Sequence, residues 1–132
     1  MVASTPFLWF GIFVVAIIVA VCALRLPKRY RIRACMGKEW RRRFPSASKE
    51  SIRRFLEIFA VEAFAFRPPH KLKFSPDDKV MDVYRAKYPL QGEPDSLELE
   101  TLYAVLRKEY GYDLGKVWSV DITLGDIFQR IM

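Results

Sequence analysis

The feature that most constrains this chain of 132 residues is a long uncharged run near its N-terminus. Residues 7–24 contain no charged side chain and no proline, and they are rich in Phe, Ile, Val and Ala. As an α-helix, a run of this length would span about 27 Å at about 1.5 Å per residue. This is close to the thickness of the hydrocarbon core of a bilayer. The run therefore predicts a single transmembrane helix within residues 1–24.

The residues around this run favour an anchor that is not cleaved. A signal peptide normally begins with positive charge, whereas residues 1–6 carry no charged side chain. From Arg25 to Pro76 there are 15 Lys or Arg residues and 4 Glu residues. Because positive charge collects on the cytoplasmic side of a span, we expect the N-terminus outside and the C-terminal domain in the cytoplasm, at the inner membrane of a bacterium.

The basic segment 25–45 is interpreted as a juxtamembrane connector. Its Arg and Lys residues are interleaved with apolar residues. Such a segment would contact anionic lipid head groups, with each base contributing about 1 kcal/mol near the surface. The same composition also suits a nucleic-acid-binding patch. The position beside the apolar run favours lipid, so nucleic acid is the less favoured partner.

Residues 46–132 show helical periodicity and no convincing pair of strands. Four stretches combine apolar residues at helical spacing with capping or breaking residues at their ends; they are 48–66, 75–88, 97–110 and 123–131. We therefore expect an all-α fold, in which a single N-terminal transmembrane helix precedes a small bundle of three to four helices.

Metal and catalytic sites are disfavoured by the residue types present. The chain holds two Cys residues and one His, which are too few for a zinc site. His70 has no evident orienting partner, and neither a Gly-rich phosphate loop nor a pair of catalytic carboxylates stands out. We expect no metal, no catalytic residue and no enzymatic activity.

A short motif, Asp95-Ser96-Leu97, opens the third expected helix, and Thr123 opens the fourth, 27 positions after Ser96. This arrangement resembles an acyl carrier protein. In that family an Asp-Ser-Leu sequence begins the second long helix of a small bundle, and a Thr-initiated helix closes it. The resemblance covers roughly residues 48–132 and is most evident from Asp95 onward.

The resemblance implies that Ser96 carries a covalent 4'-phosphopantetheine arm. The chain would then be a membrane-anchored carrier that holds an acyl or related group on this arm in lipid or fatty acid metabolism. A phosphopantetheinyl transferase would attach the arm, and acyl-transfer enzymes would use it. The residues implied in partner recognition surround the serine: Asp95, Leu97, Glu98 and Glu100.

An alternative interpretation needs no modification. Ser96 has the residue type and position of an ordinary helix N-cap, and Glu98 and Glu100 would complement the helix dipole. In that case the chain would be an unmodified, membrane-anchored adaptor with an acyl-carrier-like fold. Its acidic helix start would dock a basic partner protein.

Overall fold

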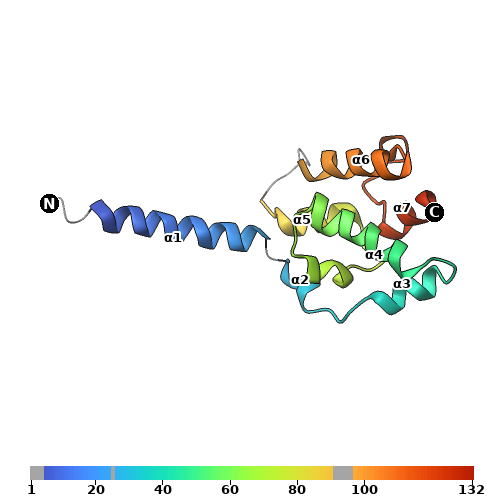
Figure 1. Ribbon diagram of the computed structural model, residues 1–132, viewed down its shortest axis with the longest axis horizontal. Helices are drawn as coiled ribbons and strands as arrows, with labels where there is room; N and C mark the ends of the chain where they lie inside the picture. The colour runs from blue at the N-terminus through green and yellow to red at the C-terminus, as the bar shows by residue number, and fades with distance from the viewer. Residues whose placement is uncertain (1–4, 25, 91–96) are drawn as a thin grey trace.

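The computed structural model describes residues 5–24, 26–90 and 97–132, and these residues are mostly helical (Figure 1). The elements follow in the order α1 (Thr5–Leu24), α2 (Lys28–Arg31), α3 (Gly37–Arg43), α4 (Lys49–Glu57), the π-helix η2 (Ile58–Ala63), the 3-10 helix η3 (Pro68–Lys73), α5 (Val80–Lys87), α6 (Leu97–Tyr110), the 3-10 turn η4 (Leu114–Lys116) and α7 (Leu124–Ile131). Within the described residues, the only β pairing is an isolated antiparallel bridge between Lys79 and Thr123. The all-α part of the predicted fold is confirmed.

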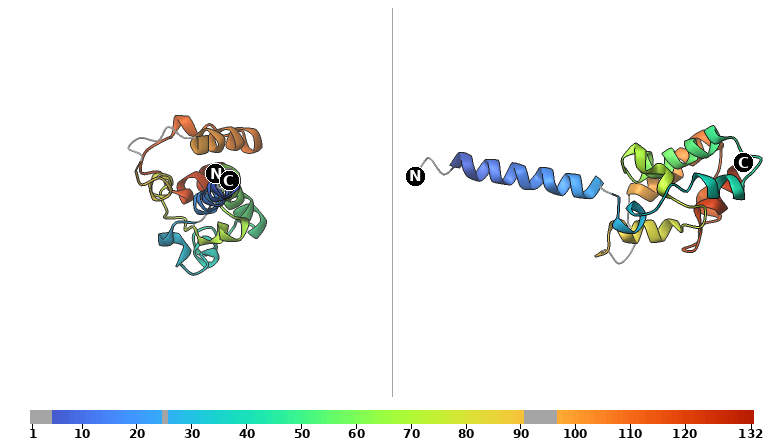
Figure 2. Two further views of the ribbon diagram at one scale, coloured as in Figure 1. Left: turned by 90° about the vertical axis from the view of Figure 1, so that its left-hand side faces the viewer. Right: turned by 90° about the horizontal axis from the view of Figure 1, so that it is seen from below.

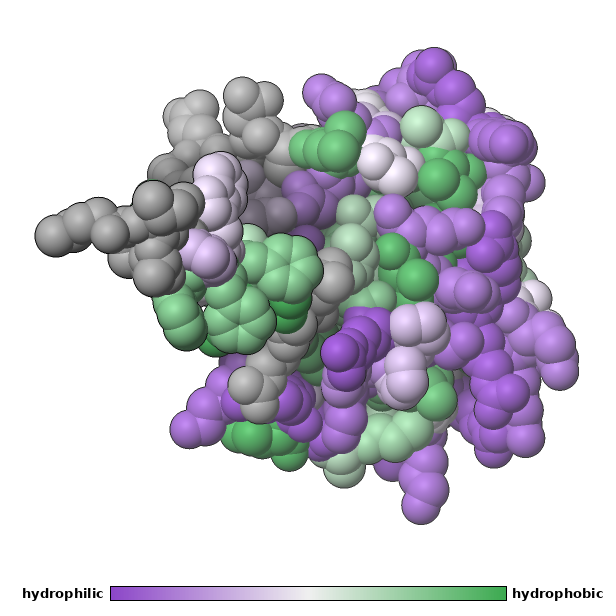
Figure 3. Space-filling model, turned by 60° about the vertical axis from the view of Figure 1, so that its left-hand side comes forward, coloured by the Kyte–Doolittle hydropathy of each residue, from purple (hydrophilic) through white to green (hydrophobic). Residues whose placement is uncertain are grey.

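Helix α1 extends away from the other helices, which pack together into one helical body (Figures 1 and 2). Its aromatic residues include Phe7, Trp9 and Phe13, which are 79%, 68% and 63% exposed. Figure 3 shows apolar side chains gathered where α1 comes forward, whereas hydrophilic side chains cover much of the helical body. The apolar surface of α1 and the core of the helical body are thus separate features.

The prediction of a transmembrane helix within residues 1–24 is wrong. In the part of the chain that the structure describes, no helix combines the length and the apolar character needed to cross a membrane. The predicted single-pass membrane localisation, with the N-terminus outside, is wrong on the same evidence.

Residues 26–44 belong to the helical body. Tyr30 on α2 and Trp40 on α3 are both 0% exposed and lie in the same core cluster as the later helices. The Trp40 ring packs edge-on against Phe128 of α7, with ring centroids 5.6 Å apart. Its indole Nε1 donates a hydrogen bond of 2.8 Å to the backbone oxygen of Phe74. The aromatic residues that separate the bases of this segment therefore anchor it to the core.

One base of the same segment is used inside the fold. Arg33 Nη1 donates to Asp78 Oδ2 at 2.6 Å, and its guanidinium lies 4.9 Å from the centre of the Tyr30 ring. The hydrogen bond to Asp78 raises the pKa of Arg33, against the opposing effect of burial. Asp78 is only 7% exposed, so this pair neutralises a buried carboxylate. Such a pair holds the chain ahead of α3 against the segment that leads into α5.

The helix predicted over residues 48–66 begins as expected and then changes type. Ser48 caps α4 by accepting a hydrogen bond from Ser51 N at 3.1 Å. From Ile58 the helix continues as the wider π-helix η2, and Ala65 follows with a φ of +58°. The π-helix η2 continues directly from α4, and α6 packs against it.

The helix predicted over 75–88 begins later than its capping signal suggested. Its first residue is Val80, because the preceding turn is held by tertiary contacts. Asp78 O accepts from Leu124 N at 2.9 Å, and Val80 N donates to Ile122 O at 3.1 Å. Residues before α5 and before α7 are therefore paired side by side, at the isolated bridge that involves Lys79.

The last two predicted helices are confirmed with nearly the expected bounds. Helix α6 ends at Tyr110, and Gly111 adopts a φ of +63°, a conformation that favours glycine. Thr123 and Asp126 form a reciprocal capping box at the start of α7, with both hydrogen bonds at 3.1 Å. These boundaries depend on local hydrogen bonds, which explains why the sequence indicated them correctly.

Candidate functional site

The site predicted from the sequence lies at the start of α6. Asp95 and Ser96 are outside the described residues, whereas Leu97, Glu98 and Glu100 belong to the first turn of α6. Leu97 is 75% exposed, and Glu100 is also exposed. Glu98 is instead partly buried and bonded to residues of α5 and its C-terminal cap. The predicted recognition residues therefore differ in what they can offer to another molecule.

Glu98 is the centre of a compact polar network. Its Oε1 accepts a hydrogen bond from Tyr88 OH and a second one, of 3.2 Å, from Lys87 Nζ. Lys87 Nζ also donates to Phe64 O at 2.5 Å and lies 5.2 Å from the centre of the Phe66 ring. The side chains of Lys87 and Glu98 are only 7% and 13% exposed. This network joins α5, α6 and the end of η2.

The network shifts the pKa values of Glu98 and Tyr88. Burial raises the pKa of Glu98, but hydrogen bonds from Tyr88, from its own backbone N–H and from Lys87, together with the charge of Lys87, bring it below its ordinary value. Burial, followed by the hydrogen bond to Glu98, raises the pKa of Tyr88 to about 12. At neutral pH, Glu98 is therefore a carboxylate whose charge is already compensated inside the fold.

Glu100 lies on a different side of α6, at the edge of a depression of about 300 Å³. Tyr103, Ala104 and Arg107 continue this edge along the helix, and Asp113 borders it from the next loop. Arg107 Nη2 pairs with Asp113 Oδ2 at 3.2 Å. This surface places the carboxylate of Glu100, which forms no ion pair with the described residues, beside the aromatic ring of Tyr103.

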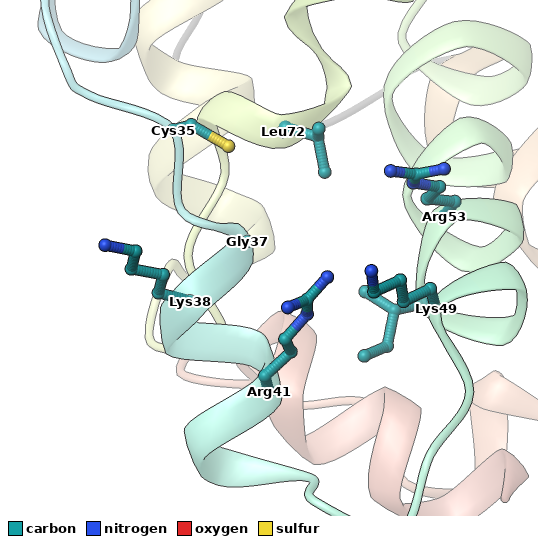
Figure 4. A pocket seen from close by; sticks show the side chains of 8 residues that line it. Cys35, Gly37, Lys38, Arg41, Lys49, Arg53 and Leu72 are labelled. Atoms are coloured by element: carbon teal, nitrogen blue, oxygen red, sulfur yellow. The ribbon is translucent and has the colours of Figure 1, made fainter.

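A second candidate site, which the sequence analysis missed, lies between α3 and α4 (Figure 4). Its lining includes Lys38 and Arg41 from α3, and Lys49 and Arg53 from α4. Bases three or four positions apart share one face of a helix, so the sequence did contain a signal for two basic faces. It could not show that the two faces meet across a pocket.

The side-chain types that most often bind metal ions are not clustered in the described structure. Among residues 5–24, 26–90 and 97–132, no group of three or more His, Cys, Asp or Glu side chains could hold a metal ion. Cys35 is exposed and free. The one buried carboxylate in the described core, that of Asp78, accepts hydrogen bonds from Arg33 Nη1 and from Ser75 N.

Comparison of the chain with protein-family models, with curated proteins and with solved structures finds no match.

Proposed function

We propose that this chain is an acyl-carrier-like module that holds an acyl or related group on a phosphopantetheine arm at Ser96. The observation that carries the proposal is the position of α6. This helix begins at Leu97, directly after Ser96 in the sequence, and its buried face includes Leu99, Leu102 and Leu106. A phosphodiester at that position would meet the free N–H groups and the positive end of the dipole of a long helix.

The residues around the motif are compatible with such an arm. Leu97 is 75% exposed and offers an apolar contact beside the attachment residue. Glu98 is compensated by Lys87, so its charge opposes a neighbouring phosphodiester less than a free carboxylate would. When bound, phosphopantetheine would supply a thiol for a thioester with the carried group. In this chain, Ser96 would hold the arm, and Leu97 and Glu100 would contact the enzymes that load and unload it.

The test is the intact mass of the whole chain after co-expression with a phosphopantetheinyl transferase. We expect the mass to increase by one phosphopantetheine group in the wild type, but not in Ser96→Ala. A matched control is Ser119→Ala, which removes the hydroxyl of a different, exposed serine and should leave the mass increase unchanged. An unmodified wild type, or an increase that persists in Ser96→Ala, would contradict the proposal.

A second candidate function is an adaptor without a prosthetic group that docks a basic partner protein. It is favoured by the exposed Glu100 at the edge of the depression on α6. Glu100→Lys should then abolish capture of such a partner in a pull-down, whereas Lys108→Glu, an exposed charge change on the same helix, should not. Glu98 is a poor choice for this test, because its reversal would disrupt the network with Lys87 and Tyr88. Unchanged capture by Glu100→Lys would remove this candidate.

A further inference from the structure

The pocket between α3 and α4 gathers positive charge around a defined space. It has a volume of about 220 Å³. Figure 4 shows the charged ends of Arg41, Lys49 and Arg53 turned toward this space from the two helices, whereas Lys38 points away from it. Three cations on two separate elements therefore converge on one volume.

The walls of this pocket are fixed by contacts below them. Met36 N donates to Leu72 O at 2.7 Å, which joins the start of α3 to η3. The hydrogen bond from Trp40 to Phe74 O holds the middle of α3 in the core. On the opposite wall, Ile52 of α4 is only 4% exposed. The bases thus project from backbone that is already in place, which lowers the ordering cost of binding.

The charge in the pocket is not balanced by the protein residues described. None of the lining residues is acidic, and none of the four lining bases forms an ion pair with a carboxylate in the described part of the chain. Neighbouring bases differ in this respect: Arg33 pairs with Asp78 at 2.6 Å, and Arg43 pairs with Asp77 at 2.5 Å. Like charges held close together repel one another, and a bound anion would remove that repulsion.

The shape and chemistry of the pocket indicate the class of anion. Guanidinium groups present planar pairs of donors that match phosphate oxygens. Leu72 and Ile52 add an apolar surface beside the bases. At about 220 Å³, the pocket is smaller than the roughly 300–1,000 Å³ typical for drug-sized ligands. A macromolecular surface or a large cofactor is a poorer fit than a small molecule.

We propose that this pocket binds a small phosphomonoester. Its phosphate would lie among Arg41, Lys49 and Arg53, and its small apolar part would contact Leu72 and Ile52. This inference goes beyond the carrier function and does not require modification of Ser96.

The test is a calorimetric titration of the whole chain with phenyl phosphate. We expect saturable binding at one site, and binding about tenfold weaker or worse in the double variant Arg41→Gln/Arg53→Gln, because two charge-assisted contacts are lost. Arg85→Gln is the matched control, since Arg85 is an exposed base on α5 outside the pocket. An unchanged thermal unfolding midpoint would show that the double variant remains folded.

Two results would overturn the assignment. One is binding that does not saturate in the wild type. The other is equal weakening by Arg85→Gln and by the double variant, which would indicate general attraction between a basic protein and an anion.

A second titration, with inorganic phosphate, separates the contribution of the phosphate from that of the organic part. We expect phenyl phosphate to bind more tightly than inorganic phosphate, and Leu72→Ala to weaken phenyl phosphate only. If the two ligands bind equally in the wild type, or if Leu72→Ala weakens both equally, the proposed apolar contact is wrong. Modification of Ser96 can be followed by mass in the same sample, so failure of one proposal is distinguishable from failure of the other.

Discussion

The start of α6 and the pocket between α3 and α4 both contain several charged residues, but the charge of Glu98 is paired within the fold and the charges of the pocket bases are not. At the start of α6, Glu98 is bonded to Lys87 and Tyr88, and the ion pair is largely buried. In the pocket, Arg41 and Arg53 point into open space and form no ion pair with the described carboxylates. The comparison shows that a charged residue type does not by itself provide an available charge.

This difference changes how the acidic motif at the start of α6 and the basic segment 25–45 are interpreted. The acidic motif was predicted to be a recognition surface, yet Glu98 contributes to holding helices together. The basic segment was interpreted as a connector to a membrane, yet Trp40 anchors it in the core while its bases line a pocket. Available positive charge is therefore the more distinctive surface property of the described structure.

The largest effect is expected from breaking the attachment of α3. Trp40→Ala should lower the free energy of unfolding by about 3–5 kcal/mol, because it removes a large buried ring and leaves a cavity. The loss of its hydrogen bond to Phe74 O adds to this effect. Chemical denaturation would measure the change. Trp40→Phe keeps most of the packing and should cost clearly less; equal losses in both variants would contradict the role given to the ring.

A smaller effect is expected from breaking the buried network at α6. Lys87→Met should lower the free energy of unfolding by about 1–3 kcal/mol, because it leaves Glu98 with an uncompensated charge. Arg41→Gln, in the pocket, should change it by no more than about 0.5 kcal/mol, as for most exposed substitutions. Denaturant titrations of both variants test the comparison directly. A larger decrease in the free energy of unfolding for Arg41→Gln than for Lys87→Met would contradict this prediction.

The smallest effect concerns the pH dependence of stability. The folded state lowers the pKa of Glu98, so its unfolded state takes up a proton first as the pH falls. The stabilisation is fully present above the unfolded pKa of about 4.3 and is lost as the pH falls through the lower folded value. The thermal unfolding midpoints of the wild type and of Glu98→Gln should be measured from neutral to acidic pH. The difference between the two midpoints should become smaller as the pH falls below about 4.3. A difference that is independent of pH would contradict the assignment.

The sequence predicted the elements whose ends depend on neighbouring residues. Ser48, Gly111 and Thr123 mark boundaries that the structure confirms, because each acts through its own backbone or through residues close in sequence. Ser75 gave a similar signal and misled, because Asp78 and Val80 are held by contacts with distant segments. The sequence thus indicated hydrogen bonds between neighbouring residues, but it did not show the tertiary contacts that compete with them.

The candidate sites follow the same division. The exposure of Leu97 and the burial of Glu98 depend on which side of α6 meets α5, and the sequence does not specify this. The two basic faces could be identified from residue spacing, whereas their convergence depends on how α3 and α4 pack. The transmembrane prediction rested on the apolar run of residues 7–24, and no helix in the described part of the chain meets the length and apolarity that a membrane span requires.

The most direct measurement of the central claim is an amide NMR titration of the whole chain with phenyl phosphate. Our account predicts saturable shift changes at Arg41, Lys49 and Arg53, with little change at Leu97, Glu98 and Lys87. This is expected because the charge at the start of α6 is already compensated within the fold, while the charge between α3 and α4 is not. Changes centred on the start of α6, with α3 and α4 unaffected, would contradict the account.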